Sequence, residues 1–240
     1  MNPLERKVAI VTGASRGLGF ATAQALARAG AHVVLAARTA SQIDALAATI
    51  RSRGGSALPL PTDVSNSDQV HSLVNATINE FGRVDILINN AALNRAAPLE
   101  NTSDEDIQLI VGINLTGALL CARAVYTQMV KQRSGTIVNV GSVLSMRPNA
   151  MNTIYCATKF ALLGFSRCLM IEGKNHNVRV IAFSPGGMAT SWYDSRPDFD
   201  TSRMMNPDSV AAFLVNALQA PDDMVPYEII VAPTTGGSWP

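Results

Sequence analysis

The chain has 240 residues and a mass of 25.4 kDa, which suits one large domain that needs no disulfide or metal to fold. Nineteen Lys and Arg residues against eighteen Asp and Glu residues give a net charge of +1, and no basic stripe indicates a nucleic-acid-binding surface. No segment approaches the ~18 uninterrupted apolar residues of a membrane span, and the first residues lack a signal-peptide pattern. Cys121, Cys156 and Cys168 have no metal-ligand spacing, so we expect buried thiols in a reducing cytoplasm.

Two kinds of segment alternate along the chain. Short apolar runs predict strands at 7–12, 32–37, 58–60, 84–88, 136–140, 178–183 and 228–231. Apolar residues at helical spacing predict helices at 18–29, 41–53, 67–81, 104–131, 152–172 and 207–219. Strands that are apolar throughout are typical of a parallel sheet covered on both faces. The sequence therefore predicts a single α/β domain over residues 1–240, a doubly wound Rossmann sheet with an irregular substrate loop at about 188–206.

The first predicted strand runs into a glycine-rich turn, Thr12-Gly13-Ala14-Ser15-Arg16-Gly17-Leu18-Gly19, which opens the first helix. Glycines allow the backbone to approach a pyrophosphate, whose negative charge then faces the amides at the helix N-terminus. The alternative is a tight strand-to-helix turn that needs glycine without any ligand. The position after a first strand and before an alanine-rich helix favours a dinucleotide site, although the spacing is not the commoner G-x-G-x-x-G.

The end of the second predicted strand, Leu35-Ala36-Ala37-Arg38, bears on which dinucleotide is bound. NAD enzymes usually carry an acidic residue there for the ribose 2′-hydroxyl, whereas a nearby Arg receives the 2′-phosphate of NADP. This chain has no carboxylate at that point and adds Arg16 inside the glycine-rich turn. Because guanidinium groups match phosphate oxygens in paired hydrogen bonds, we predict a preference for NADP(H) over NAD(H).

Further motifs follow the later strands, where a doubly wound sheet binds its ligand. They are Asn89-Asn90-Ala91-Ala92, Gly141-Ser142 and Pro185-Gly186-Gly187. Tyr155 and Lys159 lie in a predicted helix, and their i,i+4 spacing puts the phenol and the ammonium on one face. A neighbouring cation lowers the pKa of a tyrosine from its ordinary ~10, although such a pair alone also fits a surface helix. The combination of motifs favours a catalytic site.

The motifs at 12–19, 89–92, 142, 155–159 and 185–186, with Asn114 in the fourth predicted helix, agree in order and spacing with one known family. From Lys7 to about Val231 the chain closely resembles the short-chain dehydrogenases/reductases in their small form. The resemblance implies a seven-stranded sheet, a nicotinamide cofactor and a catalytic set of Asn114, Ser142, Tyr155 and Lys159. The sequence looks most like the branch that contains 3-oxoacyl-(acyl carrier protein) reductases and many other carbonyl reductases.

Two positions depart from the pattern of this family. Ala92 stands where the family commonly has Gly, and alanine is small enough to keep cofactor access. The tail at 232–240 lacks the frequent Asp-Gly-Gly, which weakens any carry-over of C-terminal subunit contacts.

The chemistry follows from the residue types. Tyr155 is the expected acid in reduction and base in oxidation, and Ser142 would donate a hydrogen bond to the reacting carbonyl oxygen. The resemblance implies that Lys159 also binds the nicotinamide ribose and that Asn114 holds a helix kink and a water of the proton relay. The alternatives are a strand-end turn former for Ser142 and an ordinary helix-breaking polar group for Asn114.

The residues expected to contact the cofactor come from the turn, the strand ends and the family resemblance. They are Gly13, Ser15, Arg16, Gly17, Leu18, Gly19, Arg38, Asp63, Val64, Asn90, Ala91, Ala92, Tyr155, Lys159, Pro185, Gly186, Met188 and Thr190. The resemblance assigns the adenine amino group to Asp63 and the carboxamide to Thr190. Asp63 is equally suited to cap the next helix, as are Ser65 and Ser67. The three histidines are scattered, so no metal site is predicted.

The favoured function is therefore a cytoplasmic NADP(H)-dependent oxidoreductase acting on a small-molecule carbonyl or alcohol. The alternatives are an NAD-dependent alcohol dehydrogenase and a non-catalytic NADP(H)-binding sensor or scaffold, which would have no need of the tyrosine acid. The substrate is either an oxoacyl thioester or a small ketone, aldehyde or hydroxylated metabolite. Arg95, Arg147 and Arg196 lie in loops expected near the site, as anion ligands or as solvated charges.

The last expectation concerns assembly. Segments 104–131 and 152–172 carry more apolar surface than one face of a sheet needs, which favours a partner subunit. The family resemblance points to pairing of these two helices between subunits and to a homotetramer. No nucleic acid or membrane partner is expected.

Overall fold

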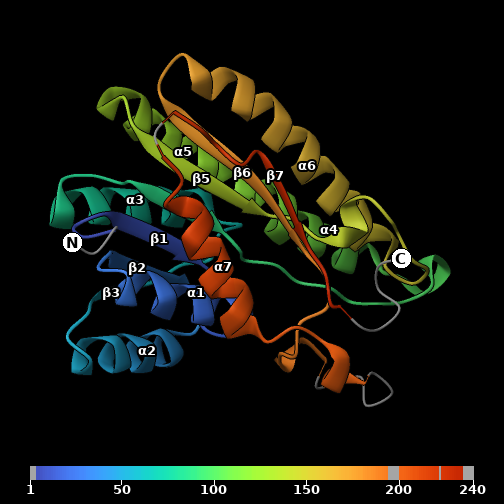
Figure 1. Cartoon of the computed structure of the whole chain (residues 1–240). Coiled ribbons are helices and arrows are strands. Elements are labelled where there is room, and N and C mark those ends of the chain that lie inside the picture. Colours follow the sequence, from blue (N-terminus) through green and yellow to red (C-terminus); the bar gives the residue numbers. More distant parts are fainter. Residues whose placement is uncertain (1–3, 194–199, 222, 235–240) are drawn as a thin grey trace.

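The computed structural model of the chain describes residues 4–193, 200–221 and 223–234, which form a sheet between two layers of helices (Figure 1). The strands are β1 (Val8–Thr12), β2 (His32–Ala37), β3 (Ser56–Pro61), β4 (Ile86–Asn89), β5 (Gly135–Val140), β6 (Val178–Pro185) and β7 (Glu228–Val231). Their order across the sheet is β3-β2-β1-β4-β5-β6-β7, and every neighbouring pair is parallel. The predicted seven-stranded doubly wound fold is confirmed.

The helices lie close to their predicted positions, with one exception. They are α1 (Gly17–Arg28), α2 (Ala40–Ser52), α3 (Ser67–Phe81), α4 (Asp104–Val111), α5 (Ala118–Gln132), α6 (Thr153–Lys174) and α7 (Pro207–Leu218). Short 3-10 helices occur at η1 (Leu99–Asn101), η3 (Val143–Ser145), η4 (Ser191–Tyr193) and η5 (Thr201–Arg203). The stretch predicted at 104–131 is helical but not regular, because α4 and α5 are joined by a π-helical segment, η2 (Gly112–Gly117), which contains Asn114, where the family resemblance implied a kink. Such segments are frequent at functional sites.

Alternate residues of each strand point toward opposite helix layers, which explains why the strands are apolar throughout. In β1, Ala9 and Val11 belong to the core beneath α1, α2 and α7, whereas Val8 and Ile10 belong to the core beneath α3, α5 and α6. Figure 1 shows α1 and α7, which are far apart in sequence, side by side in one layer. The sheet is therefore covered on both faces, and its ligand site can form only at an edge or at the strand ends.

Two local features depart from the sequence-based expectations. β3 runs further than predicted and includes Pro59 and Pro61, which it tolerates because an edge strand has one row of unpaired backbone groups. The prediction of three buried thiols was wrong for Cys168, while Cys121 and Cys156 are buried. Cys168 shares the outward face of α6 with Gly164 and Ile171, at helical spacing.

Two helical segments, Asp104–Gln132 and Thr153–Lys174, have the length and composition of membrane spans, although their apolar residues are interrupted. In each, 44% of the most apolar window is buried inside the fold. Core helices of soluble proteins pass the same test, so these segments are weak evidence for a membrane span.

Candidate active site

The order of the strands reverses between β1 and β4, and the glycine-rich turn lies at this switch point. The Thr12 hydroxyl oxygen accepts hydrogen bonds from the backbone N–H groups of Asn90 and Ala91, both at 3.0 Å. In return the Asn90 side-chain amide donates to the carbonyl oxygens of Thr12 at 3.0 Å and Gly13 at 3.3 Å. The Asn90 side chain is thus committed to the protein backbone, so the residue can contact a cofactor mainly through its backbone.

At two positions the turn requires glycine, because neighbouring atoms lie too close for a side chain. Gly13 has a φ of +65°, and a Cβ atom there would lie 2.9 Å from the Cα of Ala91. A Cβ atom on Gly19 would lie 2.3 Å from the carbonyl oxygen of Gly13. Helix α1 follows directly, and Arg16 at its N-cap makes no capping bond through its side chain. The first amides of α1 are therefore left for another acceptor, as an anion site requires.

A cavity of about 1200 Å³ extends from this turn across the carboxyl ends of the strands. This volume exceeds the ~300–1,000 Å³ of a typical small-molecule pocket, so it has room for a dinucleotide and a second molecule. All the residues predicted to bind the cofactor line it, with the exception of Gly19, which instead allows the turn to close. Of the four predicted catalytic residues, Ser142, Tyr155 and Lys159 line the cavity and Asn114 does not.

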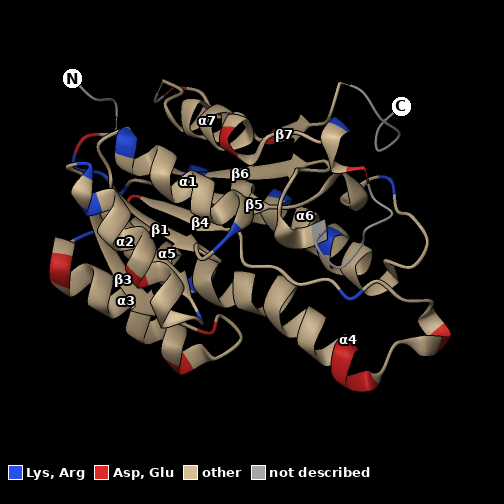
Figure 2. Ribbon diagram, turned by 90° about the horizontal axis from the view of Figure 1, so that it is seen from below, with Lys and Arg blue, Asp and Glu red and all other residues tan. Residues whose placement is uncertain are grey.

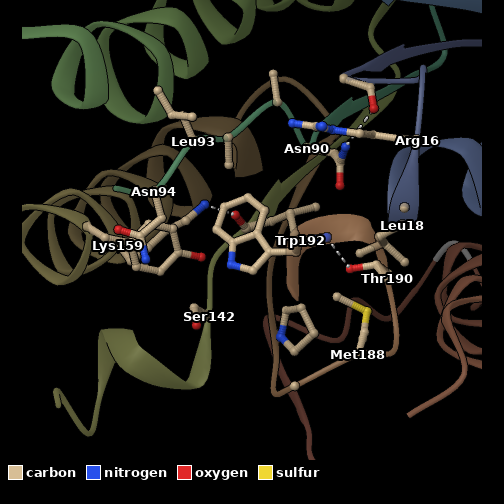
Figure 3. Close-up of a pocket in the computed structure, with 18 of the residues that line it drawn as sticks. Arg16, Leu18, Asn90, Leu93, Asn94, Ser142, Lys159, Met188, Thr190 and Trp192 are labelled. Carbon is tan, nitrogen blue, oxygen red and sulfur yellow. Dashed lines mark hydrogen bonds between the residues drawn. The ribbon is translucent and has the colours of Figure 1, made fainter. Parts of the chain in front are cut away.

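One end of the cavity lies beyond β2. Ala37 and Arg38 line it there, and Arg16 lines it from the glycine-rich turn (Figure 3). Both guanidinium groups belong to exposed residues and so can bind a phosphate without a large desolvation cost.

Figure 2 shows basic and acidic residues distributed over several elements, with acidic ones at the start of α4.

Asp63 lines the cavity but does not cap α3. Its Oδ1 accepts hydrogen bonds from the Ser65 backbone N–H at 3.0 Å and the Ser65 hydroxyl at 2.7 Å. The N-cap of α3 is Asn66, whose Oδ1 accepts from the backbone N–H of Gln69 at 3.1 Å. The capping alternatives for Asp63, Ser65 and Ser67 were therefore wrong. One carboxylate oxygen of Asp63 makes no hydrogen bond within the described part of the chain and remains for a ligand.

Lys159 is the most strongly perturbed basic group of the site. The residue is only 2% exposed, and its Nζ donates to the carbonyl oxygen of Val140 at 2.7 Å. Burial lowers the pKa of its ammonium from 10.5 to about 8. The Nζ atom lies 5.5 Å from the centre of the Tyr155 ring. Among the described residues it has one hydrogen-bond acceptor for three N–H donors, so two donors are available to a ligand.

Ser142 follows β5, while Tyr155 and Lys159 lie in the first turns of α6. The Ser142 side chain is buried, and its Oγ accepts a hydrogen bond from the Leu144 backbone N–H at 3.1 Å. The turn-forming role and the donor role are therefore compatible, because an acceptor hydroxyl keeps its own proton to donate.

Asn114 lies in the π-helical segment and is 1% exposed. Its Oδ1 accepts from the Leu93 backbone N–H at 2.7 Å, and its Nδ2 donates to the Leu93 carbonyl oxygen at 2.8 Å and to Thr158 at 3.3 Å. Asn114 thus fastens the loop after β4 to the helix next to Lys159. The structure assigns it this supporting contact, and its expected role toward a water molecule stays a prediction.

The family model for short chain dehydrogenases matches residues 7–200, most of the chain. The protein belongs to the short-chain dehydrogenase family. Among its curated relatives, a 3-oxoacyl-[acyl-carrier-protein] reductase of Synechocystis is 41% identical over 191 residues, 79% of this chain and 77% of that protein. The short-chain reductase protein NovJ of Streptomyces niveus is 35% identical, over 97% of this chain and 89% of its own.

Solved structures agree with this family. An alcohol dehydrogenase from Thermococcus sibiricus, complexed with 5-hydroxy-NADP, superposes with a TM-score of 0.87 at 29% identity, covering 94% of this chain and 95% of its own. A metagenomic short-chain oxidoreductase in complex with NADP has a TM-score of 0.86 at 30% identity, covering 98% and 100%.

The cavity of this short-chain dehydrogenase is also lined by residues that the sequence did not single out, namely Asn94, Leu144, Asn152 and Arg203. Trp192, from the expected substrate loop, lines it as well. Asn152 could have been found from the sequence, since it lies three positions before Tyr155, directly before α6.

The three arginines considered as ligands for an anionic substrate group differ in their positions. Arg95 is paired with Asp106 and is not among the residues that line the cavity. Arg147 lines it, and Arg196 lies outside the described residues. The expected substrate loop at 188–206 is held at its base, where Met205 donates to Gly187 at 3.1 Å and Ala189 donates to Met205 at 2.9 Å.

Proposed function

We propose that this short-chain dehydrogenase is an NADP(H)-dependent oxidoreductase that transfers a hydride between the nicotinamide and a carbonyl or alcohol substrate. The observation that carries the proposal is the convergence of Ser142, Tyr155 and buried Lys159 in the same cavity as the glycine-rich turn. A surface helix pair would not bury an ammonium with a pKa lowered to about 8.

The residues present fit a phosphorylated dinucleotide. The uncapped N-terminus of α1 would hold the pyrophosphate, and Arg16 and Arg38 would hold the additional phosphate. Asp63 would accept from the adenine amino group, and the two remaining N–H donors of Lys159 would hold the nicotinamide ribose. The NADP and hydroxy-NADP present in the two neighbouring structures support this choice.

Bound there, the nicotinamide would supply or accept the hydride. Tyr155 would give a proton to the carbonyl oxygen in reduction and take it back in oxidation. The ammonium of Lys159 beside the tyrosine ring stabilises the phenolate that remains after the proton has left. Ser142 would donate its hydroxyl proton in a hydrogen bond to the same substrate oxygen, where negative charge develops.

The Tyr155→Phe variant tests the mechanism, because it removes one oxygen and keeps the ring. We expect turnover to fall by at least about 10²–10⁴-fold, the usual contribution of a general acid. NADPH affinity, measured by fluorescence titration, should change little. Tyr227→Phe, at an exposed residue outside the cavity, is the matched control and should keep wild-type turnover.

The outcomes separate the alternatives. Wild-type turnover in Tyr155→Phe would refute the proposed acid. Tight NADPH binding by a wild-type protein that reduces no compound in a broad carbonyl panel would favour the sensor or scaffold. A clearly higher kcat/KM with NADH would favour the NAD-dependent alcohol dehydrogenase.

The proposal extends to one catalytic domain in a homotetramer in the cytoplasm. An apolar groove of about 450 Å³ between α5 and α6, lined by Leu119, Leu120, Phe165 and Leu169, supports subunit pairing through these helices. Unpaired Cys121, Cys156 and Cys168 support a reducing compartment. Light scattering that finds only a ~25 kDa species at micromolar concentration would refute the assembly.

A further inference from the structure

Beyond Ser142 and Tyr155, two loops wall the cavity. The loop at 93–97 follows β4, and the loop at 147–152 precedes α6. Their backbones are joined where Ala97 donates to the carbonyl oxygen of Met151 at 2.9 Å. Met151 has a φ of 65°, a left-handed conformation that is uncommon for a residue other than glycine. The fold thus holds the two loops together in spite of local backbone strain.

A row of amides crosses from one loop to the other. The Asn94 Nδ2 donates to the Asn152 Oδ1 at 2.6 Å. The Asn152 Nδ2 in turn donates to the Asn149 Oδ1 at 2.7 Å and to the Ala150 carbonyl oxygen at 3.0 Å. These bonds use the donors and the acceptor of Asn152. Asn94 keeps its carbonyl oxygen and one N–H without a partner among the described residues, and it lines the cavity.

Asn94 is also held firmly from the other direction. It directly follows Leu93, whose backbone N–H and carbonyl oxygen are both bonded to Asn114 at 2.7 and 2.8 Å. Its side chain is therefore oriented before any ligand arrives, and its free acceptor and donor require little reorganisation to bind one. Figure 3 shows Asn94 and Lys159 among the side chains that line the pocket.

Trp192 supplies an aromatic wall. Its indole and the Tyr155 ring have centroids 5.9 Å apart at an interplanar angle of 63°, an edge-to-face contact. The Trp192 backbone N–H donates to the Thr190 hydroxyl at 3.4 Å (Figure 3). An edge-to-face contact covers at most one face of the indole, and the residue is partly exposed to the cavity. Within the described part of the chain, a flat apolar surface therefore remains next to the tyrosine.

We propose that Asn94 and Trp192 select the substrate, a flat aromatic or conjugated carbonyl compound that carries a second oxygen function. Its ring lies against the indole, and its second hydroxyl or carbonyl oxygen bonds to Asn94, while the reacting carbonyl lies at Ser142 and Tyr155. This inference rests on the proposed function and specifies its substrate class. A saturated substrate of equal size loses the stacking, and a substrate with one oxygen leaves Asn94 unpaired.

The test uses pairs of ketones that differ in one property. Alpha-tetralone and alpha-decalone have similar size, but only the first contains an aromatic ring. Ring-hydroxylated alpha-tetralones add the second oxygen. We expect wild-type kcat/KM to favour alpha-tetralone over alpha-decalone by about tenfold, and the best hydroxylated tetralone by about tenfold again. Trp192→Ala should abolish the first ratio, and Asn94→Ala should abolish the second.

Ratios between substrates separate selection from general damage, because a misfolded site would lower kcat/KM for all ketones alike. Asn79→Ala, an exposed asparagine on α3 outside the cavity, is the matched control and should leave both ratios unchanged. Equal losses for all ketones in Asn94→Ala or Trp192→Ala, or unchanged ratios, would overturn the inference and leave the proposed function intact.

Binding gives a second readout that does not need turnover. The chain has two tryptophans, Trp192 and Trp239, so the Trp239→Phe variant isolates the fluorescence of Trp192. The hydroxylated tetralone should quench this signal at concentrations about tenfold lower than alpha-decalone. Selective quenching without reduction of any ketone would refute the proposed function but support the binding site. Equal quenching by both compounds would overturn the site.

Discussion

Replacing Lys159 with Met should change how the stability of the ligand-free protein depends on pH. In the folded state burial holds the pKa of this ammonium at about 8, against 10.5 for the ordinary group. Between these two pH values the unfolded chain binds more protons than the folded protein, so the free energy of unfolding rises with pH. Below about pH 8 both states are protonated and the full penalty for the buried charge remains.

The difference between 10.5 and about 8 corresponds to about 3 kcal/mol of the free energy of unfolding. The wild-type protein should gain this amount relative to Lys159→Met between pH 8 and pH 10.5. At pH 7 the Lys159→Met variant should be more stable than the wild type, but by less than about 3 kcal/mol. The gain is smaller because the Val140 carbonyl oxygen loses its hydrogen-bond donor, at a cost of about 1–3 kcal/mol.

Urea unfolding of both proteins at a series of pH values measures the difference, in which titrating groups distant from Lys159 cancel. Lys174→Met is the matched control, since the Lys174 Nζ also lies 5.5 Å from a tyrosine ring centre, that of Tyr227, but the residue is exposed. Because an exposed ammonium pays little desolvation cost, this variant controls for the loss of a lysine side chain as such. Parallel curves for wild type and Lys159→Met would refute the reasoning, since burial would then not perturb the ammonium.

Three further predictions concern the cofactor, a thiol and the assembly. Ala37→Asp should move the ratio of kcat/KM for NADPH and NADH toward NADH, because a carboxylate at the end of β2 would repel the additional phosphate and accept a hydrogen bond from the ribose hydroxyl. An unchanged ratio would mean that the additional phosphate does not bind at the end of β2. Burial raises the pKa of the Cys121 thiol from 9.0 to about 12. In a variant that carries Cys156→Ala and Cys168→Ser, iodoacetamide should therefore label Cys121 at least about a hundredfold more slowly in the folded than in the unfolded protein. Leu120→Asp in the groove between α5 and α6 should shift light scattering toward the monomer, whereas an unchanged mass would exclude that groove as an interface.

Much of the fold was predictable because it depends on local pattern. Apolar runs located all the strands, and β2 and β7 have the predicted bounds. The glycine-rich turn was recognisable because its glycines lie within eight consecutive residues, 12–19. Tyr155 and Lys159 were recognisable because residues four positions apart lie on one face of a helix. The family resemblance implied a kink at Asn114, which the structure places in the π-helical segment, but the apolar periodicity of 104–131 continues through it and does not give its bounds.

The sequence by itself determined the alternation of strands and helices, the glycine-rich turn and the tyrosine–lysine pair, because these depend on residues within a few positions of one another. The tertiary structure decided which loops meet beside them. Asn94 and Asn152 are 58 positions apart, and Arg95 turned out to serve Asp106 rather than the cavity. The burial that lowers the pKa of Lys159 likewise arises from packing against β5 and not from its neighbours in sequence. Spacing along a chain fixes contacts within a helix or a turn, whereas contacts between loops depend on how the whole sheet is wound.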